Sequence, residues 1–114
     1  MKSIPDRTFE FGVMIVKLIE SLPKNSAGYA ISNQIVRSGT SVGANVEEAQ
    51  NSPTKKDFVR GMTIALKEVR ETNYWLRILE QTKLVEIDLK SLMQENNEIV
   101  RILTTSVKNA KKSL

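Results

Sequence analysis

The sequence predicts an all-α fold, an antiparallel up-down-up-down four-helix bundle, from three observations. Apolar residues recur at steps of three and four along most of the chain. The 114 residues include only 5 Gly and 3 Pro, which leaves room for few turns. Short links join four long segments, at about residues 6–22, 26–51, 53–82 and 88–111, and short links favour antiparallel neighbours. A chain of this length forms one domain, residues 1–114.

The first segment has more apolar surface than one helix of a monomeric bundle normally buries. Pro5 and Asp6 favour a helix start, and Pro23 ends the helix. One apolar face holds Phe9, Val13, Val16 and Ile19, and a second holds Phe11, Met14, Ile15, Leu18 and Leu22. We predict that the second face, with Phe11, Ile15 and Leu18, is an interface with another copy of the chain. The alternative is a helix placed centrally in its own bundle.

The second segment contains a stretch of small residues between Arg37 and Ala49. Gly39 and Gly43 lie on one side of the predicted helix, and each glycine in a helix interior costs about 1 kcal/mol relative to alanine. Close approach of a neighbouring helix would offset this cost. A flexible loop between two shorter helices is the alternative. A phosphate-binding loop is disfavoured, because the glycine spacing is wrong and no Gly-Lys-Ser/Thr follows.

The third and fourth segments carry regular apolar seams. Ser52 as N-cap and Pro53 at the first helical position predict the start of the third helix. Its seam comprises Phe58, Met62, Ala65, Val69, Thr72, Leu76 and Leu79, at alternating steps of four and three. Asn96 occupies a core position on the seam of the fourth helix, where a polar residue often fixes register at a cost in stability.

Composition restricts the possible function. The chain has neither cysteine nor histidine, so it lacks a thiolate, the commonest general base and the commonest transition-metal ligand. We therefore expect no enzyme activity and no cofactor. The N-terminal residues do not form a signal peptide, and the apolar segments are too short for a membrane span, so we expect a cytoplasmic protein.

Charged residues near the small-residue stretch predict a polar network. Glu68 and Glu71 lie three residues apart and reach a common point from one helix. Because no histidine is available, a carboxylate metal site is disfavoured. We predict instead that Arg37 pairs with one of Glu48, Glu68 and Glu71, within or between subunits, in a buried network that also includes Asn45.

A basic face on the third helix is the main candidate for binding. Net charge is only +4, but Lys56, Arg60, Lys67 and Arg70 share one face with Thr63, and Lys55 is nearby. These side chains could follow the phosphates of RNA or DNA. No aromatic residue lines this face between Lys55 and Arg70, so we expect weak sequence preference. The alternative is a solvated face with local ion pairs.

Several motifs resemble one family. They are Val36-Arg37-Ser38, Ser41-Val42-Gly43-Ala44-Asn45-Val46-Glu47-Glu48-Ala49, Lys56-Asp57-Phe58, Ile64-Ala65-Leu66-Lys67-Glu68-Val69-Arg70-Glu71-Thr72 and Tyr74-Trp75-Leu76. In this order they resemble the four-helix-bundle proteins encoded in intervening sequences of bacterial 23S ribosomal RNA genes. The resemblance runs from about Phe9 to Leu103. Many members have Ala-Asn-Ile-x-Glu-Gly, whereas this chain ends that motif with Glu48-Ala49.

The resemblance implies an antiparallel four-helix bundle, commonly a homopentamer, without established catalytic activity. Relatives of the family include basic accessory proteins of diversity-generating retroelements, which work alongside a reverse transcriptase. The sequence therefore predicts a non-catalytic homo-oligomer that binds nucleic acid, or a nucleic-acid enzyme such as a reverse transcriptase. A purely structural or protein-binding assembly without nucleic acid is the alternative.

Overall fold

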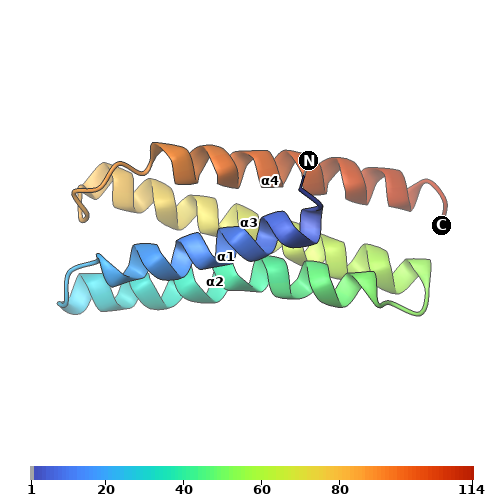
Figure 1. Ribbon diagram of the computed structural model, residues 1–114, viewed down its shortest axis with the longest axis horizontal. Coiled ribbons are helices and arrows are strands. Elements are labelled where there is room, and N and C mark those ends of the chain that lie inside the picture. Colours follow the sequence, from blue (N-terminus) through green and yellow to red (C-terminus); the bar gives the residue numbers. More distant parts are fainter. Residues whose placement is uncertain (1) are drawn as a thin grey trace.

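The computed structural model describes residues 2–114, which form four helices (Figure 1). They are α1 (Ile4–Glu20), α2 (Ser26–Gln50), α3 (Lys55–Thr82) and α4 (Lys90–Lys111). Residues 2–114 contain no strand, so the predicted all-α class is confirmed. None of the helices in this part of the chain has the length and apolar character needed to cross a membrane.

The first three helices begin after side chains that accept a hydrogen bond from a backbone N–H of the first turn, those of Ser3, Asn25 and Thr54. The predicted start of α3 at Pro53, with Ser52 as its cap, was wrong. Thr54 is the cap: its Oγ1 accepts from the backbone N–H of Asp57 at 3.1 Å and also lies 2.8 Å from Asp57 Oδ2. These two contacts satisfy an otherwise unpaired N–H and place an acid in the first turn.

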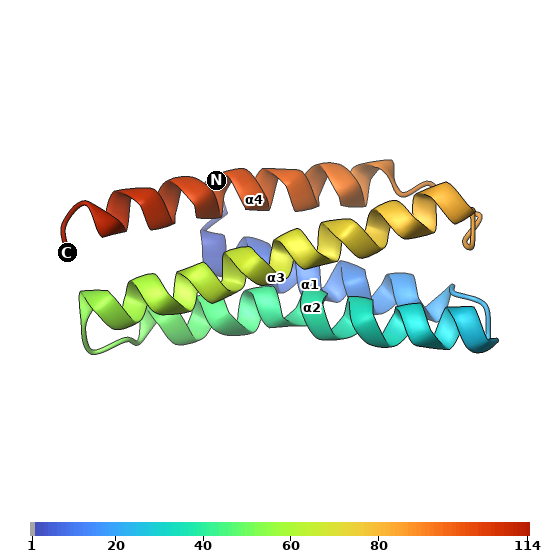
Figure 2. The same ribbon diagram turned by 180° about the vertical axis from the view of Figure 1, so that it is seen from behind.

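Successive helices lie side by side and run in opposite directions (Figures 1 and 2). α2 packs against α1 and α3, and α4 packs against α3. α1 and α4 share the smallest interface of the four neighbouring pairs. The domain measures 47 × 21 × 21 Å, as expected for helices aligned along one long axis.

The core follows the predicted seams. On α3, every seam residue from Met62 to Leu79 is buried, and on α2, Ile35, Val42 and Val46 have no exposed surface. Asn96 is also fully buried, and neither atom of its amide group has a hydrogen-bond partner among the described residues. Its predicted core position is therefore confirmed.

The small residues of α2 allow α1 to lie close, as predicted. A Cβ at Gly39 would be 2.7 Å from Ile15 Cγ1, well inside van der Waals contact. A Cβ at Gly43 would be 3.0 Å from the backbone oxygen of Thr8. The two glycines thus form the surface on which α1 rests, and the stretch is continuous helix, not a loop between two shorter helices.

An ion pair links α1 to α4 across their small interface. Arg7 donates from Nε to Glu95 Oε2 at 2.8 Å and from Nη2 to Glu95 Oε1 at 2.9 Å. These hydrogen bonds raise the pKa of the Arg7 guanidinium above its ordinary value. Such a two-pronged pair fixes the relative position of two side chains more narrowly than a single contact does.

Candidate nucleic-acid interface

The predicted basic face of α3 lies on the outside of the bundle. Alternating steps of four and three place Lys56, Arg60, Lys67 and Arg70 on one side of the helix, and all four side chains are exposed. We call this set the basic row. The opposite side of α3 carries the buried seam, so packing of the seam turns the basic row toward solvent.

Few acids neutralise the basic row. Arg60 Nη2 lies 3.5 Å from Asp57 Oδ1, one turn away on the same helix. Within residues 2–114, Lys56, Lys67 and Arg70 form no ion pair. Most of the charge of the row is therefore available to an external anion.

Lys55 lies beside the row at the start of α3. Its Nζ donates to Ser113 Oγ at 2.9 Å, which brings the C-terminal end of α4 next to this end of α3. Lys111 and Lys112 are exposed there as well. The positive charge is thus concentrated at one end of the bundle and continues along α3.

The basic row extends further than the sequence analysis proposed. The same steps beyond Arg70 lead to Tyr74 and then to Arg77, and both residues are exposed. The conclusion that no aromatic lines this face held only as far as Arg70. The helical period itself was the available signal, because a step of four from Arg70 reaches Tyr74.

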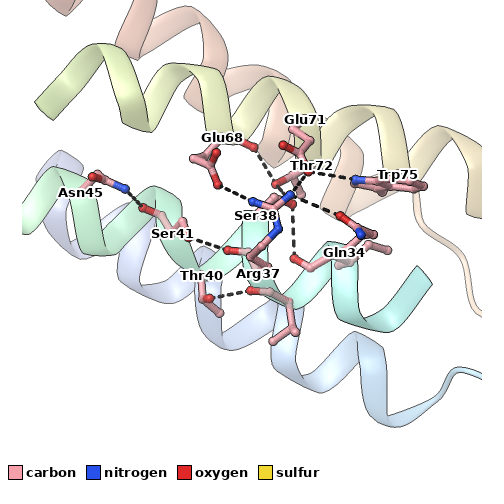
Figure 3. A network of polar contacts seen from close by, with 12 residues as sticks. Gln34, Arg37, Ser38, Thr40, Ser41, Asn45, Glu68, Glu71, Thr72 and Trp75 are labelled. Carbon is pink, nitrogen blue, oxygen red and sulfur yellow. Dashed lines mark hydrogen bonds and ion pairs between the residues drawn. The ribbon is translucent and has the colours of Figure 1, made fainter. Parts of the chain in front are cut away.

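Glu68 and Glu71, which are adjacent in sequence to Lys67 and Arg70 of the row, are held by Arg37 across the α2–α3 interface (Figure 3). Arg37 Nη1 donates to Glu68 Oε2 at 3.3 Å, and Nη2 forms an ion pair with Glu71 Oε2. Gln34 Oε1 accepts from Nη2 at 3.3 Å. The predicted pairing of Arg37 with Glu68 or Glu71 is confirmed with both acids.

The network is not buried as predicted. Half of the Arg37 side chain is exposed, so the ion pairs lie at the surface of the α2–α3 seam. Directly beneath them, the hydroxyl groups of Ser38 and Thr72 are fully buried and hydrogen-bonded at 2.8 Å. Thr72 was predicted on the buried seam of α3 but was not paired with Ser38, because spacing along one helix does not show which residue of the next helix lies opposite.

Two of the predicted network residues lie elsewhere. The Asn45 amide donates to the backbone oxygen of Ser41 at 2.8 Å, within its own helix. Glu48 is exposed, and its side chain forms no ion pair within residues 2–114. The physical reason is distance along the helix: Glu48 lies eleven residues after Arg37 on α2, about 16 Å at about 1.5 Å per residue, so the two side chains cannot meet within one chain.

The predicted oligomer interface was also wrong. Phe11 and Ile15 have no exposed surface and Leu18 is buried, all within their own chain. The other apolar face of α1 faces solvent instead: the exposed fractions are 62% for Phe9, 40% for Val13 and 41% for Val16. The chain does carry an excess apolar surface, but on the opposite side of α1.

The exposed face of α1, with Phe9, Val13 and Val16, borders an apolar groove. The groove has a volume of about 550 Å³ and runs between α1 and α2. Its walls are formed by bulky residues of α1 and small residues of α2, chiefly Phe9, Val13, Val16, Thr40, Gly43 and Ala44. We call it the α1–α2 groove. A contiguous exposed apolar surface of this kind is typical of sites where a protein binds a partner.

A metal centre has no support in the geometry. Within residues 2–114, no three acidic side chains converge into a cluster that could hold a metal ion. Glu68 and Glu71, the closest pair of acids in the predicted network, are both engaged by Arg37.

The arrangement of charges is suited to binding an extended anion along α3.

The sequence profile of one protein family, described as 23S rRNA-intervening sequence protein, matches residues 3–105. The chain belongs to this family. Among solved structures, a protein of unknown function from the S23 ribosomal protein family of Bacteroides thetaiotaomicron superposes with a TM-score of 0.85. Its sequence is 38% identical over 93% of this chain and 99% of that chain. No curated protein is significantly similar.

The motifs of this chain that resemble the family have structural roles at the α1–α2–α3 contacts. Gly43 supports α1, and Val42 and Val46 fill the core. Glu68 and Glu71 bind Arg37. The resemblance identified in the sequence is confirmed by the family match. The residues that carry it also help to hold the first three helices together.

Proposed function

We propose that this protein is a non-catalytic, oligomeric four-helix scaffold that binds RNA or DNA through the basic row of α3, with Lys55 at its end. The observation that supports this function best is the row itself: regularly spaced, exposed cations on one straight helix. Phosphate contacts by Lys and Arg supply most of the affinity in sequence-independent nucleic-acid binding. The proposal assigns the protein no catalytic step and no cofactor.

The surroundings of the row favour an anionic partner over a solvated face with local ion pairs. Of the row, Arg60 alone forms an ion pair within residues 2–114, at 3.5 Å from Asp57, and such exposed pairs contribute about 0–1 kcal/mol. Glu68 and Glu71 are held on the α2 side by Arg37. An incoming phosphate therefore meets little competition and little repulsion along most of α3.

Self-association is the second part of the proposal, and the α1–α2 groove is its interface. Exposed Phe9, Val13 and Val16 lose contact with water when a second copy covers them, and burial of apolar area drives association. The family resemblance suggests five copies in a closed ring. Repeating the basic row around a ring would strengthen binding to a long strand through avidity.

A second candidate function is a structural or protein-binding assembly that never contacts nucleic acid. The α1–α2 groove favours it, since the groove is apolar and fits a protein surface better than a phosphate chain. A reverse-transcriptase-like enzyme is one protein partner of this kind. In that case the exposed cations of α3 would serve solubility only.

A filter-binding experiment separates the two functions. The parent protein is compared with a variant that carries Lys56→Gln, Arg60→Gln and Lys67→Gln. We expect the variant to lose binding to RNA and DNA while its oligomer mass stays the same, because the row lies away from the α1–α2 groove.

The control is a second variant with an equal change in charge, Lys24→Gln, Lys90→Gln and Arg101→Gln. These side chains are exposed on other parts of the bundle. We expect this variant to bind nearly as well as the parent. Equal loss in both variants would show that only net charge matters, and absence of binding by the parent would favour the protein-binding assembly.

A further inference from the structure

The extended face of α3 combines cations with one aromatic residue. Tyr74 and Arg77 continue the basic row, and the Tyr74 side chain is 51% exposed. From Lys56 to Arg77 the helix covers about 32 Å at about 1.5 Å per residue. Proteins that bind single strands use this combination, a cationic track for the phosphates and an aromatic ring for a base.

The Tyr74 ring is held in place by its neighbours. Its centroid lies 5.1 Å from that of Trp75, with 79° between the ring planes. Trp75 Nε1 in turn donates to Glu71 Oε2 at 3.2 Å, and Glu71 is bound by Arg37 (Figure 3). The aromatic pair is thus anchored to the α2–α3 network, and a ring that is already ordered loses less entropy when a ligand binds.

A shallow hollow of about 210 Å³ lies beside Tyr74, between Arg77, Ile78 and Glu80. The Glu80 carboxylate repels a phosphate but accepts hydrogen bonds from the exocyclic amino group of a base. Arg77 offers a cation at the edge of the same hollow. The chemistry of the hollow therefore suits a base with its phosphate next to Arg77.

We propose that the extended row binds single-stranded nucleic acid, with phosphates along Lys56, Arg60, Lys67, Arg70 and Arg77 and one unpaired base stacked on Tyr74. This inference rests on the proposed function and narrows its ligand. A duplex strand turns fully about every 34 Å, so it leaves a straight row before the row ends. A flexible single strand can follow the row, and its bases are free to stack.

Binding assays with Tyr74→Leu test the proposal. The probes are RNA and DNA single strands of about 15 nucleotides, their duplexes, and a strand of the same length without bases. We expect single strands to bind more tightly than duplexes. Tyr74→Leu should weaken single-strand binding about five- to a hundred-fold and leave duplex and base-free binding unchanged, because only the stacked base is lost.

Two variants serve as controls, together with melting curves that verify folding. Tyr74→Phe retains the stacking face and should bind as the parent does. Tyr29→Leu removes an equally exposed tyrosine from α2, outside the row, and should also have no effect. A loss caused by Tyr29→Leu as large as that caused by Tyr74→Leu would overturn the assignment of the base to Tyr74.

The remaining outcomes distinguish the two proposals. Suppose that duplexes bind at least as tightly as single strands, and that the variant changed at Lys56, Arg60 and Lys67 no longer binds them. The inference about single strands is then wrong, while the proposed function stands. The inference fails in the same way if Tyr74→Leu binds single strands as tightly as the parent. If the parent protein binds none of the probes, both proposals are wrong.

Discussion

At Gly39, the absence of a methyl group determines how closely α1 can lie on α2. A Cβ there would overlap Ile15, which is fully buried in the core, so Ile15 or α1 would have to shift. At Gly12, on α1, a Cβ would be 3.9 Å from the nearest atom, an ordinary contact with the Thr40 Cα. Packing of α1 on α2 therefore requires glycine at position 39 but not at position 12.

This difference predicts opposite effects of alanine at the two positions. Gly39→Ala should lower the free energy of unfolding, since overpacking costs about 1–3 kcal/mol and the gain in helix propensity offsets only about 1 kcal/mol. Gly12→Ala should raise it by up to about 1 kcal/mol. Urea denaturation of both variants measures the effects. Stabilisation by Gly39→Ala as large as that by Gly12→Ala would contradict the close approach of α1.

Single residues also show where reasoning from sequence succeeded and where it did not. Arg37 among small residues correctly indicated a partner across the helix interface, because a cation at such a position needs acids nearby. The degree of burial was wrong, since spacing gives the side of a helix but not the depth below the surface. Tyr74 was overlooked because the helical face was followed only as far as Arg70, one step of four before Tyr74.

At the scale of elements, α1 has apolar residues on two faces, and sequence periodicity cannot decide which face packs inward. The decision depends on α2: Gly39 and Gly43 leave space that fits Ile15 and the backbone of Thr8, so the Phe11–Ile15–Leu18 side turns inward. Phe9, Val13 and Val16 are then left outside. The face of α1 that packs inward is thus determined by how its shape fits α2. The pattern of apolar residues in either helix alone does not contain this information.

The exposed face of α1 predicts how self-association can be disrupted. Val16→Glu places a charge in the α1–α2 groove and should dissociate the proposed assembly into folded single chains, because burying an unpaired carboxylate is costly. Met14→Glu is the matched control, as Met14 is also exposed on α1 but outside the groove. Light scattering gives the mass. If Met14→Glu dissociated the assembly and Val16→Glu did not, the groove would not be the interface.

The whole molecule is a chain of helices, each packed on its sequence neighbours. The class, the number of helices and most of the core were predictable, because three- and four-residue periods extend over whole helices and short links force antiparallel neighbours. The helix starts were less predictable: Thr54, and not Ser52, caps α3, since both residue types favour the cap and only the contact with Asp57 decides between them.

The buried face of α3 also determines the position of the candidate binding surface. Packing of the seam against α2 and α4 leaves the basic row and Tyr74 outermost along one straight edge of the molecule. The Arg37 network lies on the α2 side of the same helix and holds two acids there. Cations therefore lie on the outer side of α3, and Glu68 and Glu71 lie on its α2 side. This local distribution of charge, and not the small net charge of the chain, is the reason to expect nucleic acid as the ligand.

The most direct measurement is the dependence of the binding constant for a single-stranded oligonucleotide on salt concentration. For the parent protein we expect the logarithm of the constant to fall linearly with the logarithm of salt concentration, because bound phosphates release counterions. Removing Lys56, Arg60 and Lys67 together should reduce that slope by about 2, at about 0.7 per lost contact. A parent slope near zero, or an unchanged slope in the variant, would contradict phosphate binding by α3.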